Sequence, residues 1–100
     1  MRKKVDSYLG FAAKSRNLIS GYHTCLNSIK QKKLKLLILS EDLSENTINK
    51  LMKLSEKNGI PVRIYGKSVE LSKVTGNRGR GVFGITDKNF ADIILTEIDE

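Results

Sequence analysis

The stretch that decides the fold runs from Asn17 to Thr47 and reads NLISGYHTCLNSIKQKKLKLLILSEDLSENT. It opens with a very short strand candidate, Leu18-Ile19, and Ser20-Gly21 then begins a helix, with Ser20 as its predicted cap. A lysine-rich turn follows, and residues 34–39 read LKLLIL, an almost unbroken apolar run of strand length. The order of strand, helix and buried strand predicts an α/β fold.

Upstream of this stretch, the pattern predicts a basic arm and one helix. Residues 1–4 carry an arginine and two lysines, and we expect them to form a loose arm. The apolar positions that follow have helical spacing and predict a helix as far as about Lys14. They are Val5, Tyr8, Leu9 and Ala12.

Downstream, strands and helices continue to alternate. The expected elements are a helix capped by Asp42 or Ser44 and ended by Asn58-Gly59, a strand at 62–65, a short helix at 68–74, a glycine-rich loop at 75–81, a strand at 82–86 and a helix capped by Asp87. The chain of 100 residues is therefore predicted to form a single domain, a three-layer α-β-α sandwich with a small mixed sheet of about four strands. The pattern leaves the strand order open.

Charge is distributed unevenly along the chain. The net charge is +7, from 18 lysines and arginines against 11 acidic residues. Residues 1–40 hold nine of the basic residues and one acid, whereas residues 88–100 hold one lysine and four acids. Such asymmetry favours a polyanionic partner, and a solvated surface tuned for solubility is the alternative.

Two absences narrow the class of protein. The single cysteine, Cys25, has no partner for an internal disulfide, so we expect a reducing, cytoplasmic setting. No segment approaches the ~18 consecutive apolar residues of a membrane span, and the apolar run 9–13 is too short for a signal peptide. We therefore expect no membrane partner.

The sequence offers little for catalysis or for a cofactor. His23 and Cys25 are two residues apart on a helix, which directs them to different sides, and there is no second His or Cys to complete a metal site. The spacing of Gly79, Gly81 and Gly84 matches a dinucleotide fingerprint, but the loop leads into a strand instead of a helix. We predict a protein without catalytic residues, metal or cofactor.

Basic residues surround the predicted helix start at Ser20-Gly21. A helix N-terminus presents unpaired N–H groups and partial positive charge, which suits a phosphate. Lys14 and Arg16 precede it, with solvated turn charges as the alternative, and Lys30 belongs to a lysine cluster that the helix dipole alone would favour. The loop TGNRGRG at 75–81 adds two arginines, more than a glycine-rich turn requires.

Five segments of the chain resemble the kink-turn RNA-binding ribosomal protein superfamily of the L7Ae and L30e type, with its small bacterial YlxQ-like members. The segments are YLGFAAKSRNLISG, KLKLLILSEDLSENTINKL, NGIPVRIY, ELSKVTG and VFGITDKNFADIIL, which span residues 8–95 in the family order. The resemblance implies an α-β-α sandwich with a four-stranded sheet. It also implies binding to RNA, often at a sharply bent internal loop with sheared G·A pairs.

The resemblance also implies where RNA would lie: against the start of the second helix and the loop before the last strand. Family members commonly carry Asn, Glu and Lys two, three and six positions after the helix-start glycine, where this chain has His23, Thr24 and Asn27. These side chains can still bond base edges or phosphates, although the acceptor for guanine donors is missing. The full set of expected RNA-binding residues is Lys14, Arg16, Ser20, Gly21, His23, Thr24, Asn27, Lys30, Glu41, Lys73, Gly76, Asn77, Arg78, Gly79 and Arg80.

Three functions follow from these observations. The leading one is a small RNA-binding protein, monomeric, whose partner is ribosomal RNA or another kink-turn-like structured RNA, with the ribosome as a candidate assembly. The alternative is a protein–protein interaction module on the same fold that has lost kink-turn binding, which the change to His23, Thr24 and Asn27 motivates. A third is the detached substrate-binding domain of an RNA-modifying enzyme, which would need a catalytic partner.

Overall fold

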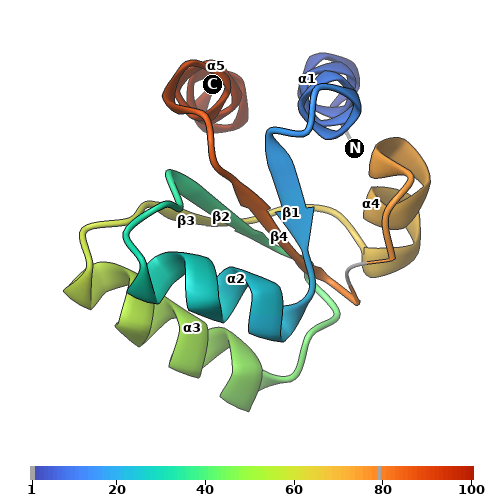
Figure 1. Ribbon diagram of the computed structural model, residues 1–100. Coiled ribbons are helices and arrows are strands. Elements are labelled where there is room, and N and C mark those ends of the chain that lie inside the picture. The colour runs from blue at the N-terminus through green and yellow to red at the C-terminus, as the bar shows by residue number, and fades with distance from the viewer. Residues whose placement is uncertain (1, 79) are drawn as a thin grey trace.

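The computed structural model describes residues 2–78 and 80–100. In this part of the chain, helices and strands alternate (Figure 1). The elements are α1 (Lys3–Lys14), β1 (Leu18–Ser20), α2 (Tyr22–Lys30), β2 (Leu36–Leu39), α3 (Glu45–Lys57), β3 (Val62–Ile64), α4 (Ser68–Thr75), β4 (Val82–Ile85) and α5 (Lys88–Asp99). The predicted elements are confirmed with ends that differ by one or two residues.

The four strands form one mixed sheet in the order β1-β4-β2-β3. Strand β4 is antiparallel to both of its neighbours, and β2 and β3 are parallel. The LKLLIL segment supplies β2, which lies inside the sheet and is buried at all four positions. An almost continuous apolar run is therefore explained by burial on both faces.

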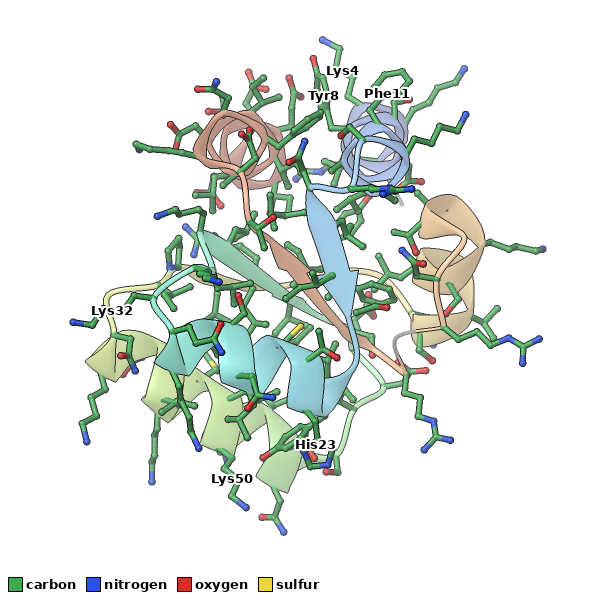
Figure 2. All side chains as sticks on the ribbon, viewed as in Figure 1. Lys4, Tyr8, Phe11, His23, Lys32 and Lys50 are labelled. Atoms are coloured by element: carbon green, nitrogen blue, oxygen red, sulfur yellow. The ribbon has the colours of Figure 1, made fainter. Side chains whose placement is uncertain are left out.

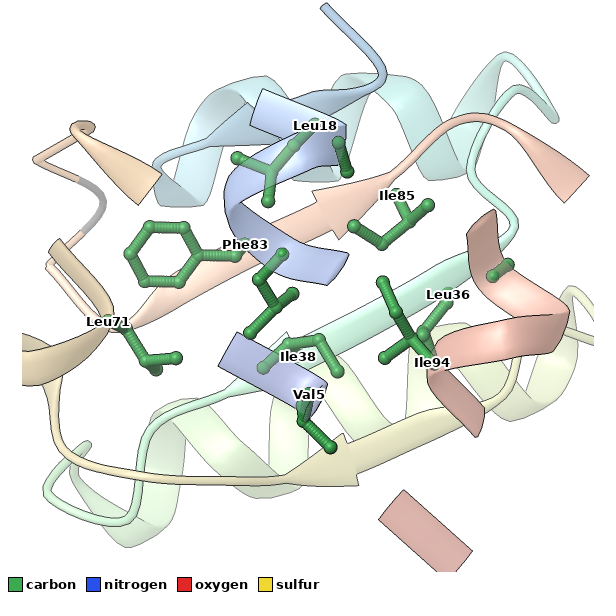
Figure 3. Packing of buried hydrophobic residues seen from close by; sticks show 11 residues of the cluster. Val5, Leu18, Leu36, Ile38, Leu71, Phe83, Ile85 and Ile94 are labelled. Atoms are coloured by element: carbon green, nitrogen blue, oxygen red, sulfur yellow. The ribbon is translucent and has the colours of Figure 1, made fainter. Parts of the chain in front are cut away.

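Helices cover both faces of the sheet, which confirms the predicted three-layer sandwich. Helices α1, α4 and α5 lie on one face, and α2 and α3 lie side by side on the other (Figure 1). Alternate residues of β2 serve the two layers: Leu36 and Ile38 pack under α1 and α5, whereas Leu37 and Leu39 face α2 and α3. Figure 3 shows the first of these cores, with Phe83 between Leu18 and Leu71.

Gly84 allows α2 to pack close to the sheet. A Cβ at this position would stand 2.3 Å from Cδ1 of Leu34 and 3.3 Å from Sγ of Cys25. Because Gly84 has no side chain, α2 and the segment after it can approach β4 closely at this position. This close packing fixes the position of α2 relative to the end of β4.

The helix caps agree with the sequence in part. Ser44 caps α3 by accepting a hydrogen bond from the Thr47 N–H, and Asp87 caps α5 by accepting from the Phe90 N–H. Asp42, the alternative cap for α3, instead accepts two bonds from Ser68 at the start of α4, at 2.9 and 3.1 Å. It joins two elements that are distant in sequence.

The expectation that Ser20 caps the second helix is wrong. Ser20 is the last residue of β1, and the N-cap is Gly21, whose φ of 102° is accessible to glycine and strained for other residues. The strand turns directly into the helix at this glycine. As a result α2 has no side-chain cap.

The expectation of a loose arm at residues 1–4 is wrong where the structure describes it; Met1 lies outside the described residues. Helix α1 already begins at Lys3. The Arg2 guanidinium donates to the carbonyl oxygens of Glu97 and Ile98, and its backbone N–H donates to the Tyr65 hydroxyl at 2.7 Å. The cationic group therefore lies at the C-terminus of α5, where the helix dipole favours it.

No helix within the described residues combines the length and the apolar character needed to cross a membrane.

Candidate nucleic-acid interface

The start of α2 and the arginine-bearing loop lie at the same edge of the sheet. Ser20 pairs with Phe83 in the β1–β4 ladder, and the Gly21 N–H donates a 2.8 Å hydrogen bond to the Val82 carbonyl oxygen. Because Val82 begins β4, the preceding loop must lie next to the start of α2. Two segments about 60 residues apart in sequence are thus adjacent.

Both segments line one hollow of about 400 Å³. Arg78 and Arg80 contribute from the loop, and both side chains are exposed. The other lining residues are Gly21, Tyr22, Leu43, Thr47 and Val82. The hollow contains two cationic side chains and no carboxylate among these residues, so it suits a negatively charged ligand.

The first turn of α2 contributes unpaired backbone N–H groups. The first bond of the helix runs from the Cys25 N–H to the Gly21 carbonyl oxygen at 3.1 Å, so the N–H groups of Tyr22, His23 and Thr24 precede the helical ladder. No side chain caps them, and the first turn holds no acidic residue. The partial positive charge of this nine-residue helix is therefore open to a ligand.

The side chains that replace the family's usual Asn, Glu and Lys are all exposed on α2. The His23 ring packs edge-on against the Tyr22 ring, with centroids 5.2 Å apart and planes at 86°. Thr24 and Asn27 instead line a second hollow, of about 720 Å³, beside the edge strand β1. That hollow continues past Gln31 to the lysine turn with Lys32, Lys33 and Lys35.

The loop between α4 and β4, residues 76–81, is called the arginine loop, and hydrogen bonds hold its backbone at both ends. Gly76 ends α4 with a φ of 70°, and the Thr75 hydroxyl accepts a bond from the Asn77 N–H at 3.2 Å. At the other side, the Gly81 carbonyl oxygen accepts from the Ser40 N–H at 2.8 Å, and Arg80 itself has a φ of 49°. The arginines therefore extend from a backbone that β2 and α4 hold. Gly79, also expected in the site, lies outside the described residues.

Some predicted site residues lie elsewhere. Lys14 and Arg16 lie at the opposite end of β1 from the helix start. The Asn17 carbonyl oxygen, just before β1, accepts a hydrogen bond from the Thr86 N–H, just after the end of β4. We expected them near Ser20 because they are close to it in sequence, but the extended strand β1 separates them from it in space. The strand keeps Asn17 and Gly21 roughly 13 Å apart.

Three further candidates are exposed and lie outside the shared hollow. Lys30 is in the last turn of α2, at the end away from the loop, and Lys73 is in the last turn of α4. Glu41 follows Ser40 directly after β2, so its backbone neighbours the base of the arginine loop. Its own N–H donates to the Gly66 carbonyl oxygen at 2.8 Å.

Sequence reasoning missed four residues of the hollow, among them Val82, the first residue of β4. Tyr22 follows the helix-start glycine and was not among the expected site residues, but it is partly exposed and lines the hollow. Leu43 and Thr47 come from the segment that leads into α3. An aromatic residue directly after the helix-start glycine was a usable signal for Tyr22. Leu43, Thr47 and Val82 could be placed only from the tertiary structure.

The one cysteine, Cys25, is buried in α2. Burial raises the pKa of the Cys25 thiol to about 12, so it stays protonated and unreactive at neutral pH. Residues 2–78 and 80–100 contain no group of three His, Cys, Asp or Glu side chains placed to hold a metal ion. The distinctive features of the surface are cationic groups and free N–H donors.

Two curated proteins named RNA-binding protein YlxQ are similar over nearly full length. The one from Bacillus subtilis (strain 168) is 29% identical over 91% of each chain, and that from Enterococcus faecium is 31% identical over 90% of this chain and 86% of its own.

Solved structures show the same fold. A protein of unknown function from Bacillus halodurans C superposes with a TM-score of 0.94 at 31% identity, over 99% of this chain and 100% of the other. The Giardia lamblia 15.5kD RNA binding protein superposes with a TM-score of 0.81 at 16% identity, over 99% of this chain and 91% of the other, which establishes likeness of fold. Residues 3–95 match the model of one family. The chain therefore belongs to the ribosomal protein L7Ae/L30e/S12e/Gadd45 family.

Proposed function

We propose that this protein binds structured RNA without catalysis, through the hollow shared by the start of α2 and the loop before β4. The observation that carries the proposal is the convergence of Gly21, Arg78 and Arg80 on that hollow. Uncapped N–H groups and two guanidinium groups are both suited to phosphate oxygens. The two YlxQ proteins that this chain resembles are named RNA-binding, which supports the same conclusion.

The two sides of the surface have different tasks in this proposal. The helix-start N–H groups and the arginines fix the RNA backbone, because phosphate contacts position a nucleic acid without reading its sequence. In this proposal the exposed side chains of His23, Thr24 and Asn27 contact base edges, Thr24 and Asn27 from the neighbouring hollow beside β1. With no Glu in this first turn, guanine amino groups have a hydroxyl or an imidazole nitrogen as acceptor instead of a carboxylate.

We infer that the RNA is bent, of the kink-turn kind or similar. A hollow of about 400 Å³ between two elements can accept an unpaired base that a straight duplex would keep stacked. Arg78 and Arg80 at its border can stack on such a base or contact the phosphates beside it. Ribosomal RNA is the natural candidate partner, with the protein acting as a monomer.

The test compares two RNAs that differ in shape. One is a labelled hairpin with an internal loop closed by two sheared G·A pairs, and the other replaces the loop by a continuous Watson–Crick duplex. Fluorescence anisotropy at fixed salt should show at least about tenfold tighter binding to the bent RNA. Equal, weak binding to both would reduce the protein to a non-specific cationic surface, and no binding to either would favour the protein-interaction alternative.

A further inference from the structure

The surface between α2 and α3 has a third hollow, which Tyr22 also lines but to which no described residue of the arginine loop contributes. It measures about 480 Å³ and runs along two helices that lie side by side (Figure 1). We call it the α2–α3 groove. Its lining residues are Tyr22, Leu26, Lys50, Leu51, Lys53, Leu54 and Lys57.

The base of the groove is apolar. Leu51 is fully buried, while Leu26 and Leu54 are only partly covered by the rest of the protein. Tyr22 and Leu26 are four residues apart on α2, so they form a continuous strip one helical turn long. Cys25 and Ile29 are buried between α2 and the sheet, and Tyr22 also packs against this core. Because Tyr22 and Leu26 are only partly covered, the rest of their surface remains on the outside.

Three lysines of α3 border this base. Lys50, Lys53 and Lys57 follow the spacing i, i+3, i+7, so they share one side of the helix, and all three are exposed. Figure 2 shows Lys50 extending from α3 into solvent. The ion pairs within the described residues are Arg63–Asp99 and Lys88–Asp92, so none of the three lysines is neutralised by a carboxylate there.

The sequence of α3 places no carboxylate four residues before any of these lysines, and the acidic residue nearest to them at helical spacing is Glu56, three residues after Lys53. A carboxylate four residues before each lysine would stabilise an exposed helix by about 0.2–0.5 kcal/mol. Those positions hold Asn46, Asn49 and Lys53. Lys53 and Lys57 therefore repel each other, which a surface designed for stability alone would avoid.

We propose that the α2–α3 groove binds an acidic amphipathic helix of a partner protein. Aliphatic side chains of the partner helix would cover the apolar base of the groove at Tyr22, Leu26 and Leu54. Carboxylates of the partner helix would pair with the three lysines. Lys50 and Lys57 are seven residues apart on α3, about 10 Å along the helix, which matches two turns of a bound helix.

The apolar base favours a protein over RNA as the occupant. A phosphate backbone would use the three lysines but would gain nothing from burying leucine side chains. Single strands are held by several aromatic side chains on which successive bases stack, and the lining has one aromatic residue, Tyr22, which also contacts the His23 ring. An amphipathic helix uses both the charge and the apolar surface.

This inference goes beyond the proposed RNA binding and does not depend on it. The two sites share Tyr22, which lines both the arginine-bearing hollow and the α2–α3 groove. An RNA and a protein could therefore be held on adjoining surfaces by one small domain. The inference assigns the protein a bridging role between RNA and a protein partner.

The experiment is a titration of the ¹⁵N-labelled protein with a designed helical peptide, followed by heteronuclear NMR. The acidic probe, about 14 residues long, has Leu at i, i+3, i+4 and i+7 with Glu at the flanking positions, and a second probe has Lys for every Glu. The expected result is amide shifts confined to α2 and α3 around Leu26 and Leu54. The acidic probe should bind at least about tenfold more tightly than the basic one.

Matched variants separate a specific groove from general positive charge. Lys50→Glu with Lys53→Glu should reverse the preference between the two probes, and it leaves Glu at position i−4 of Lys57, which supports the helix. Lys3→Glu with Lys4→Glu makes the same change in net charge on α1, on the other face of the sheet, and should leave the preference unchanged. Thermal unfolding followed by circular dichroism verifies that both variants fold.

Three results would overturn the inference. One is that the acidic probe shifts the amide signals of lysine-bearing surfaces throughout the protein. Another is a Lys50→Glu, Lys53→Glu variant that binds the acidic probe as tightly as the original protein. The third is a titration with the bent RNA hairpin that shifts the groove amides around Leu54 while the acidic probe does not, which would assign the groove to RNA. If the proposed RNA site is wrong, the titration with the bent RNA hairpin will show no amide shifts in the arginine loop, whatever the acidic probe does.

Discussion

The Gly21 N–H and the Val82 carbonyl oxygen, 2.8 Å apart, join the start of α2 to the beginning of β4. This bond extends the β1–β4 ladder by one residue beyond the Ser20–Phe83 pair. It places three uncapped N–H groups beside a loop with two arginines. The proposed RNA surface follows from this one connection between the second helix and the last strand.

Replacing both loop arginines tests the electrostatic part of the site. Arg78→Ala with Arg80→Ala should weaken binding of the bent RNA hairpin and flatten the dependence of log K on log salt. Each lost phosphate contact lowers the slope by about 0.7–0.9, because fewer counterions are released. Anisotropy titrations at several salt concentrations measure the slope.

The matched control is Lys3→Ala with Lys4→Ala, which removes two positive charges from exposed positions on α1. Figure 2 shows Lys4 on the opposite side of the molecule from His23. This variant should keep most of the affinity and nearly the original slope. An equal effect of the two variants would mean that net charge, and not the loop, governs binding.

Gly81→Ala tests the base of the arginine loop. Gly81 has a φ of 95°, and a Cβ there would stand 2.2 Å from the Ser40 Oγ and 3.0 Å from Cδ2 of Leu43. We expect a loss of about 2–4 kcal/mol in the free energy of unfolding, from backbone strain and steric overlap together. Urea denaturation measures the loss.

Gly59→Ala separates strain from overlap. Gly59 has a φ of 68°, and nothing lies within 4 Å of the added Cβ. This variant should cost about 1–2 kcal/mol, the penalty of a left-handed residue alone. If Gly81→Ala destabilises the protein no more than Gly59→Ala does, the loop is not held against Ser40 and Leu43 as described.

The Asp42 carboxylate predicts a pH dependence of stability. The Ser40 hydroxyl and the hydrogen bonds from Ser68 lower its pKa from 3.8 to about 2. A depressed pKa in the folded state contributes stability above the unfolded pKa and loses it as the pH falls through the folded value. The contribution should therefore be complete above about pH 4 and disappear towards pH 2.

Urea denaturation midpoints between pH 5 and pH 2 check this, with Asp42→Asn for comparison. The variant should be less stable than the original protein at pH 5, and the two should converge towards pH 2 because a protonated Asp42 loses the same charge. Parallel curves across the range would show that the link between Asp42 and Ser68 does not stabilise the fold.

Tyr65→Phe tests the connection that holds the N-terminus. The Tyr65 hydroxyl donates to the Asp6 carboxylate at 2.8 Å and accepts from the Arg2 N–H at 2.7 Å. Its loss should cost about 1–2 kcal/mol in the free energy of unfolding, because two polar groups lose a partner. Hydrogen exchange of the first turn of α1 should also accelerate, while RNA affinity stays unchanged. Unaltered exchange in α1 would contradict a fixed N-terminus.

Periodicity was sufficient to predict most of the fold. The apolar run that became β2 and the spacing of Val5, Leu9 and Ala12 in α1 are local signals, and burial confirms both. The fixed position of Arg2 was not predictable, because its partners Tyr65 and Ile98 lie 63 and 96 residues away in the sequence. Contacts between distant segments leave no periodic signal.

The site was predicted in part for the same reason. The helix start at Gly21 and the two loop arginines were recognised locally, and the structure places them together. Lys14 and Arg16 are close to Gly21 in sequence, but an intervening extended strand separates them from it in space. Residues that are close in sequence lie far apart in space when an extended strand lies between them.

The most direct measurement of the central claim is an NMR titration of the ¹⁵N-labelled protein with the bent RNA hairpin. We expect the largest amide shifts at Tyr22, His23 and Thr24 and in the loop from Gly76 to Gly81, and we expect both sets to saturate at the same RNA concentration. Shifts confined to the lysine turn after α2, or to only one of the two sets, would contradict a single RNA surface built from the helix start and the arginine loop.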